Sequence, residues 1–246
     1  MTQKWICCNW TAALMFCLVA SPPSPAQEFK TVVNFEGING AVPNGPLIQG
    51  LDGNLYATTS SGGSGNTGTM FKATPSGTLT TLYNFCSKSG CTDGANPTAA
   101  LVEAIGGNFY GVTRGGGTNS GGTVFGITPA GELRTLYSFC AQTDCADGEL
   151  PQGLLLDPDG SLYGTTQNGG ASGQGTVFRL VGPTLTTLYS FCAQPDCADG
   201  EVPNGLVLAS DGNLYGTTQG GDRQPWYGLQ DHTKRWIDDD AQLQRR

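Results

Sequence analysis

Histidine and clustered basic residues are scarce in this 246-residue chain. It has one histidine, His232, and 12 lysines and arginines against 20 aspartates and glutamates. A single histidine near the C-terminus excludes a Ser-His-Asp arrangement or a histidine metal site in the rest of the chain. The basic residues occur singly along most of the chain, whereas nucleic acids and anionic membranes select clustered Lys and Arg. We therefore expect no nucleic acid among the partners.

Long hydrophobic runs are also lacking. An apolar run from Trp5 to Ala20 is broken by two polar residues, and it is shorter than the about 20 residues that a membrane-spanning helix needs. Lys4 precedes it, and a Ser/Pro-rich stretch ends at Ala26. This order predicts a signal peptide over residues 1–26, and hence a chain secreted to the extracellular space or cell envelope without a membrane span. A lipid anchor at Cys17 is a weaker alternative, because a bulky residue precedes it.

Six cysteines lie beyond the predicted signal peptide, in three pairs of equal spacing. An even, regular set in an exported chain predicts disulfides within each pair. Zinc bound by paired thiolates is the alternative, and export and the Asp-rich surroundings disfavour it. Redox catalysis is less favoured still, because a C-x-x-C site has two intervening residues rather than four. The predicted disulfides are Cys86 to Cys91, Cys140 to Cys145 and Cys192 to Cys197.

Glycine, in contrast, is abundant. Of 38 glycines, only Gly228 lies outside residues 27–221. Such a segment is either turn-dense or disordered. The glycines are interleaved with phased Leu, Val, Phe and Tyr, a pattern that disordered segments lack. We therefore expect an ordered, turn-rich segment.

Residues 27–221 contain about four copies of one unit, with boundaries near 31–81, 82–135, 136–187 and 188–221. A fixed period of about 50 residues indicates a tandem repeat array. The aromatic residue of an LYGTT-type box recurs in every unit, and the Phe of a GTVF-type box recurs in three. These positions are Tyr56, Tyr110, Tyr163 and Tyr215, and Phe71, Phe125 and Phe178.

Each unit contains four short runs with strand composition, such as GLLLD, SLYGTT, GTVFRL and LTTLYSF. An Asp-Gly pair between the first two runs, as at Asp52-Gly53, predicts a type I′ hairpin. A small residue at the centre of the LYGTT run, such as Gly164, predicts a close approach of neighbouring strands. Four antiparallel strands in about 50 residues predict an all-β, propeller-like array of blades with a kelch-like period, incomplete or open. A β-solenoid is the alternative.

The repeat also resembles a known family, the Gloeo/Verruco tandem repeat of secreted bacterial proteins. The resemblance rests on the pattern F…DG..P.G…DG.LYGTT..GG..G.GTVF and covers about residues 31–221. It implies a repeat architecture and a location outside the cytoplasm. It implies no activity.

Connections in an antiparallel meander alternate between the two ends of the strands. The short turns of each unit therefore share one end and the longer loops share the other, and binding sites concentrate in such loops. Eight positions separate Phe35 from Pro43, but twelve separate the equivalent residues where cysteines occur. Each disulfide is therefore expected to clip a four-residue extension. Acidic residues of two of these loops offer oxygen ligands to calcium, although turn chemistry and solvated charge explain them as well. They are Asp144, Asp147 and Glu149, and Asp196, Asp199 and Glu201.

No set of residues in the repeats marks a catalytic site, and no cofactor is expected apart from the weak case for calcium. A GxGxxG match from Gly63 to Gly68 precedes a predicted strand, whereas a dinucleotide site requires a helix there. The sequence favours a binding scaffold for an unidentified extracellular ligand, a glycan or a protein. The alternative is a carbohydrate-active hydrolase or lyase that uses two carboxylates.

The composition changes abruptly inside the fourth unit. After Gly221 the repeat requires a GTVF strand, but residues 222–246 are rich in charge and contain one glycine. We expect a weakly ordered tail and an unpaired strand edge prone to self-association. Residues Lys30 to Phe35 match the fourth strand of a unit and could pair into the unfinished fourth unit.

Overall fold

A computed structural model describes residues 30–221 and 236–237. The predicted signal peptide, residues 1–26, lies outside the described residues. So does most of the tail, whose weak order stays a prediction. The described strands belong to one compact unit that begins at Val32. In the described part of the chain, no helix is long and apolar enough to cross a membrane.

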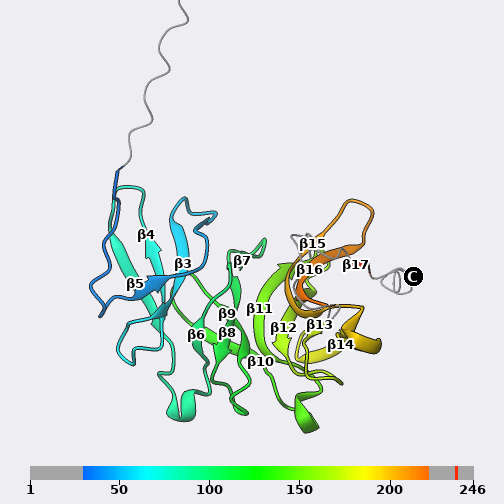
Figure 1. Cartoon of the computed structure of the whole chain (residues 1–246). Coiled ribbons are helices and arrows are strands. Elements are labelled where there is room, and N and C mark those ends of the chain that lie inside the picture. Colours follow the sequence, from blue (N-terminus) through cyan, green and yellow to red (C-terminus); the bar gives the residue numbers. More distant parts are fainter. Residues whose placement is uncertain (1–29, 222–235, 238–246) are drawn as a thin grey trace, which may run out of the picture. The chain divides into compact units, whose positions relative to one another are not determined.

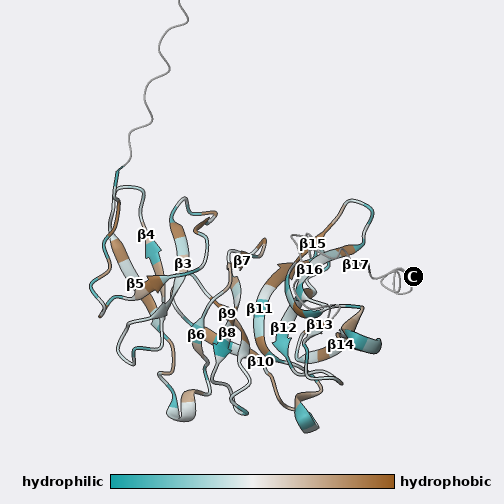
Figure 2. Ribbon diagram, viewed as in Figure 1, coloured by the Kyte–Doolittle hydropathy of each residue, from teal (hydrophilic) through white to brown (hydrophobic). Residues whose placement is uncertain are grey.

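The repeats form four antiparallel sheets, one for each unit (Figure 1). Within each sheet the strands follow one another as a meander, and hydrophobic residues are concentrated along the strands (Figure 2). The predicted all-β, propeller-like architecture is confirmed, and the array is open rather than closed into a ring. We number the sheets one to four along the chain.

The first sheet contains β1 (Ala41–Pro43), β2 (Ile48–Gln49), β3 (Leu55–Ser61), β4 (Thr69–Ala73) and β5 (Leu79–Asn84). The second contains β6 (Ala95–Pro97), β7 (Val102–Glu103), β8 (Phe109–Gly115), β9 (Thr123–Ile127) and β10 (Leu133–Ser138). The third contains β11 (Glu149–Leu156), β12 (Leu162–Asn168), β13 (Thr176–Val181) and β14 (Thr184–Ser190). The fourth contains β15 (Glu201–Leu208), β16 (Leu214–Gly220) and β17 (Trp236–Ile237).

The hairpin between the first two runs of a unit is tight, but it is not the predicted type I′ turn. In the first sheet only Gly53 has positive φ, at 80°, while Asp52 does not. The amide of Gly53 donates to the carbonyl of Gly50 over 2.9 Å, and the Asp52 carboxylate accepts the amide of Asn54 over 3.0 Å. This is a turn followed by one left-handed glycine, in which aspartate caps the backbone from its side chain.

Phenylalanines join consecutive sheets. The Phe that follows the fourth strand of one sheet packs edge-on against the Phe of the GTVF-type box in the next sheet. The ring centroids of Phe85 and Phe125 are 5.1 Å apart, as are those of Phe139 and Phe178. These four rings are fully buried. A buried Phe contributes about 2–3 kcal/mol, so the repeated pair accounts for the period of the sequence pattern.

The small residue at the centre of the LYGTT strand is required by packing, as predicted. A Cβ atom on Gly164 would lie 2.5 Å from the Phe178 ring, and one on Gly111 would lie 2.5 Å from the Phe125 ring. The phenylalanine of the third strand therefore covers the glycine of the second. A larger side chain would displace the ring that joins the two sheets.

The segment from Lys30 to Phe35 does not pair into the fourth sheet. It forms no strand, and Val33 and Phe35 pack against the first sheet. The rings of Phe35 and Phe71 are 5.0 Å apart, which repeats the contact between the later sheets. The hydrophobic pairing of Phe35 with the first sheet explains why the expectation is wrong.

Candidate functional site

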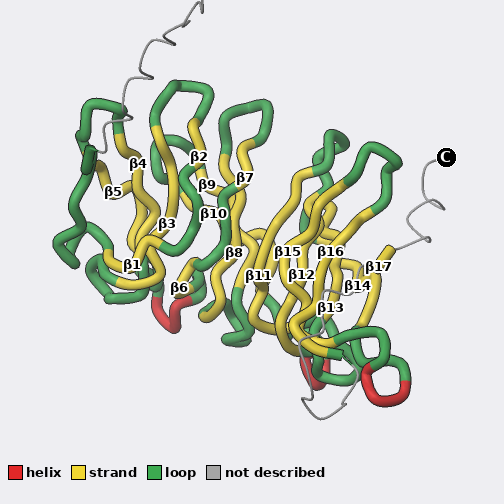
Figure 3. Tube along the Cα trace, turned by 45° about the horizontal axis from the view of Figure 1, so that its top comes forward, coloured by secondary structure: helices red, strands yellow, loops and turns green. Residues whose placement is uncertain are grey.

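The candidate site consists of the three loops that join one sheet to the next. We call residues 86–94, 140–148 and 192–200 the cysteine loops. Each follows the fourth strand of one sheet and precedes the first strand of the next, and Figure 3 draws their short 3-10 turns in red at one edge of the sheets. The turns are η1 (Ser89–Cys91), η2 (Thr143–Cys145) and η3 (Pro195–Cys197).

A disulfide closes each cysteine loop, and the pairs are the predicted ones. The Cα atoms of the paired cysteines are 4.0 to 4.1 Å apart. The prediction of disulfides is thereby confirmed, and the sulfur atoms are not thiolates that could hold zinc in this state. Three disulfides indicate an oxidising compartment, as outside the cell. They link Cys86 to Cys91, Cys140 to Cys145 and Cys192 to Cys197.

An aspartate holds each loop together from inside, and it is buried in the first two loops and partly buried in the third. The Asp147 carboxylate accepts the hydroxyl of Tyr137 over 2.8 Å and the backbone amides of Ala141 and Gln142 over 3.0 and 3.1 Å. Asp147 is fully buried, so the expectation of a solvated charge at this position is wrong. A buried carboxylate is tolerated because several donors replace its water. The same arrangement joins Tyr83 to Asp93 and Tyr189 to Asp199.

These contacts shift the ionisation of both partners. Burial, and the hydrogen bond to Asp199, raise the pKa of Tyr189 to about 12. Burial alone would raise the pKa of Asp199, but the amide of Ala193 and the hydroxyl of Tyr189 outweigh it, and the net shift is downward. The pair therefore favours one state, an ionised aspartate beside a neutral tyrosine, at neutral pH.

The first connector, residues 36–42, has neither the cysteines nor this pair. It makes a two-residue turn in which Gly37 and Gly40 exchange backbone hydrogen bonds of 3.2 and 3.1 Å. Asn39 stands where the other loops have aspartate, and its side chain accepts the amide of Glu36 over 2.8 Å. Val33 stands where they have tyrosine. Cysteines, tyrosine and aspartate thus occur together or not at all.

Three connectors nevertheless make the same contact with the sheet that follows them. The carbonyl of Gly37 accepts the amide of Gly63 over 2.8 Å, and the carbonyl of Cys91 accepts that of Gly117 over 2.9 Å. In the third sheet, Cys145 accepts from Gly170 over 3.0 Å. The double glycine after the second strand is therefore where the sheet binds its own connector.

The Gly-rich loops also bond consecutive sheets to each other. The amide of Leu150, at the start of the third sheet, donates to Gly121 of the second sheet over 2.9 Å. The amide of Val202 donates in the same way to Gln174 of the third sheet, also over 2.9 Å. Cysteine loops and Gly-rich loops therefore form one continuous surface held by backbone hydrogen bonds.

The tips of the cysteine loops are exposed and differ in charge. The tip of the first loop carries Lys88, and the equivalent residues of the others are Gln142 and Gln194. Two positions further on, the second and third loops carry the exposed residues Asp144 and Asp196. The loops thus share one backbone and present different side chains to solvent.

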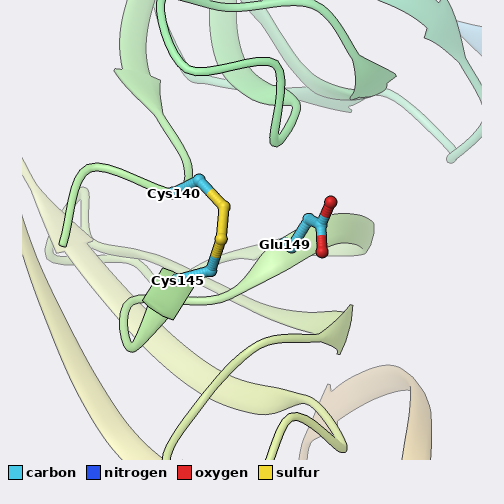
Figure 4. A group of neighbouring side chains, drawn as sticks. All are labelled: Cys140, Cys145 and Glu149. Atoms are coloured by element: carbon cyan, nitrogen blue, oxygen red, sulfur yellow. A yellow bond between two sulfur atoms is a disulfide. The ribbon is translucent and has the colours of Figure 1, made fainter. Parts of the chain in front are cut away.

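The acidic residues of the loops do not gather into a carboxylate cluster. Among the described residues, one candidate metal group was found, in which ligand atoms of Cys140, Cys145 and Glu149 lie within 4.8 Å of one another. Figure 4 shows that its two sulfur atoms form the disulfide beside the carboxylate. The case for calcium stays a prediction, and because Asp147 and Asp199 are bonded within their loops, it would rest on the other acids: Asp144, Glu149, Asp196 and Glu201.

Two other features of the sequence take no part in this surface. The GxGxxG match is a loop that leads into β4, and no helix follows it. His232 lies outside the described residues. The Tyr-Asp pair of the cysteine loops, by comparison, does belong to this surface and is not among the residues predicted from the sequence. A signal exists in the sequence, since tyrosine and aspartate recur ten residues apart only where cysteines occur.

The chain belongs to the Gloeobacter/Verrucomicrobia repeat family, whose model matches residues 21–226. This agrees with the resemblance noted in the repeat. A search of curated proteins found no match.

Solved structures with a similar arrangement of strands include a gluconolactonase from Xanthomonas campestris. It is 16% identical with a TM-score of 0.46, and the match covers 70% of this chain and 55% of that one. The extracellular domain of a two-component system from B. thetaiotaomicron is also 16% identical with a TM-score of 0.48, over 71% and 20% of the two chains. PorZ, a surface component of the type-IX secretion system of Porphyromonas gingivalis, is 13% identical with a TM-score of 0.47, over 72% and 23%. The chain spans 56% of the length of a further solved structure, described as a putative gluconolactonase. We draw no conclusion about chemistry from these likenesses.

Proposed function

We propose that the protein is a secreted binding scaffold whose cysteine loops form the recognition surface. The observation that carries this proposal is the first connector. It bonds to its sheet through the same carbonyl as the cysteine loops do, with four residues fewer and no disulfide. The extension of the cysteine loops is therefore not needed for a connector to bind the sheet that follows it.

The extension has the properties of a binding surface. Each loop is closed by a disulfide and anchored by an aspartate that its own backbone amides and a tyrosine hold, so little conformational entropy is lost when a ligand binds. The first loop places a different tip on the same backbone from the second and third, as binding loops on rigid scaffolds do. Three equivalent loops along one surface suit an extended or repetitive ligand, such as a polysaccharide or a cell-envelope protein, through multivalent contacts.

The test is a loop replacement. The chain is produced by export, so that its disulfides form, and is screened against arrays of polysaccharides and of extracellular proteins. In a matched variant, each cysteine loop is replaced by the sequence EGING of the first connector. We expect the wild type to bind at least one class of ligand and the variant to lose it, while circular dichroism shows that the sheets remain folded.

Two results would contradict the proposal. One is a folded loop-replacement variant that binds as tightly as the wild type. The other is a wild-type protein that binds nothing on either array. Single changes refine a positive result: Asp144→Lys alters only an exposed tip, and Glu132→Lys, an exposed residue in the hairpin between β9 and β10, is its control.

A further inference from the structure

The outer edge of β16 differs from the same edge in the complete sheets. In the third sheet, β12 pairs with β13 over five positions, from Leu162 opposite Leu180 to Thr166 opposite Thr176. In the fourth sheet, β17 pairs with β16 at Tyr215 and Gly216 alone. Beyond these two positions, no described strand pairs with the outer edge of β16, whereas β15 pairs with its inner edge.

Thr218, near the end of this edge, has a buried hydroxyl without a partner. It is 3% exposed, and its Oγ1 accepts or donates no hydrogen bond within the described part of the chain. In every complete sheet the equivalent threonine bonds to the threonine that begins the third strand. The pairs are Thr59 and Thr69 at 2.9 Å, Thr113 and Thr123 at 2.8 Å, and Thr166 and Thr176 at 2.9 Å.

Asn213, at the other end of β16, has a second unpartnered atom. Its Oδ1 is buried and bonds to no residue in the described ranges. In the third sheet the equivalent residue, Ser161, accepts Nη2 of Arg179 over 2.8 Å. Arg179 lies on the third strand, and it also reaches Asp159 over 3.2 Å. A basic residue at this place in the fourth sheet would meet both Asn213 and the equivalent aspartate, Asp211.

β17 reproduces only part of this pattern. It pairs Trp236 with Gly216, just as β13 pairs Phe178 with Gly164. It then pairs Ile237 with Tyr215, where the third sheet has Arg179. Isoleucine carries no side-chain hydrogen-bond donor, so β17 supplies at this position no donor for Asn213 such as Arg179 supplies for Ser161.

We propose that the outer edge of β16 accepts an extended strand of the pattern Gly-Thr-apolar-Phe-basic from another repeat-bearing chain. Adding a strand to a sheet edge supplies backbone hydrogen bonds, and alternate side chains give the specificity. The incoming strand takes the place of β17, which pairs with Tyr215 and Gly216. Its threonine then satisfies Thr218, its phenylalanine lies opposite Gly216, and its basic residue satisfies Asn213 and the negative charge of Asp211. Thr218 lies beside Gly200 at the end of the third cysteine loop, but the peptide test involves no ligand of the loop tips, so the two proposals can fail independently.

The test uses a fluorescent peptide with the sequence of residues 173–181, GQGTVFRLV, titrated with the full chain and followed by anisotropy. We expect saturable binding. A Thr176→Val peptide and an Arg179→Leu peptide should each bind about three to ten times more weakly, the usual effect of one lost hydrogen bond. In the Thr218→Val protein, the native and Thr176→Val peptides should bind equally. The control variant is Thr80→Val, which alters an exposed strand residue and should leave the difference intact.

Several results would overturn the proposal. They are the absence of saturable binding, equal binding of a scrambled peptide, and a Thr176→Val effect that persists in the Thr218→Val protein. Sedimentation distinguishes a further occupant, a second copy of this chain. A stable dimer that excess peptide does not dissociate would show that the edge binds another copy instead.

Discussion

The first connector and two of the cysteine loops bind the sheet that follows them through the same backbone contact but differ in length and in side chains. The first is a bare turn between two glycines, in which Asn39 caps one amide. The cysteine loops add a disulfide and a Tyr-Asp hydrogen bond. The comparison separates two roles. A carbonyl that accepts from the double glycine is sufficient to bind a connector to its sheet, whereas the disulfide and the Tyr-Asp pair order the extension.

The most severe disruption of this comparison is Asp147→Ala. It leaves the hydroxyl of Tyr137 and two backbone amides without their acceptor in a buried place. We expect a loss of about 3 kcal/mol in the free energy of unfolding, measured by urea denaturation. Asn39→Ala removes one exposed bond in the first connector and should cost about 1 kcal/mol or less. Equal losses in the two variants would show that the connectors are not anchored differently.

Removing one disulfide should have a smaller effect. The double variant Cys140→Ser with Cys145→Ser opens a six-residue ring, for which the chain-entropy model predicts a loss of about 2 kcal/mol. Far-ultraviolet circular dichroism should still show the full strand content, because the first connector folds without cysteines. Loss of the sheets in this variant would contradict the separation of roles.

Alkaline pH should weaken the cysteine loops and spare the first connector. The pKa values of Tyr83 and Tyr189 are raised to about 12 in the folded chain, above the unfolded value of 10. Their stabilisation is therefore complete below pH 10 and is lost as the pH rises from 10 to 12. At pH 11 we expect the free energy of unfolding to have fallen by about 1 kcal/mol for each tyrosine, after allowance for solvent screening. Urea denaturation between pH 8 and 12 measures this, and a Tyr189→Phe variant should lose less stability over the same range. A flat profile above pH 10 would contradict the pairing.

The smallest effect concerns the residue before the proline that follows each connector. Val202 has φ of 51° and Asn96 has φ of 54°, a left-handed conformation that costs a β-branched residue more free energy than asparagine. Val202→Asn should therefore stabilise the chain by about 0.5 to 1 kcal/mol. Asn96→Val should destabilise it by a similar amount. Thermal unfolding of both variants tests the pair, and shifts in the same direction would show that φ is not the cause.

Much of the candidate site could be predicted from the sequence, but its anchor could not. The cysteine pairs are five residues apart and recur in equivalent loops, so their pairing is a local matter. The role of Asp147 depends on Tyr137, which lies ten residues earlier on β10. Its hydroxyl donates to the Asp147 carboxylate in the folded chain. Acidic residues beside glycine are also typical of solvated turns, and composition does not distinguish the two.

The sequence by itself determined the period, the antiparallel strands of the units, their short turns and the disulfides, because these depend on contacts between near neighbours. The tertiary structure decided the rest. Whether Asp147 is buried and whether Phe35 joins the first sheet or the fourth depend on how sheets and loops pack against one another. Such packing depends on the shapes of neighbouring sheets, so a pattern read along one strand does not contain it.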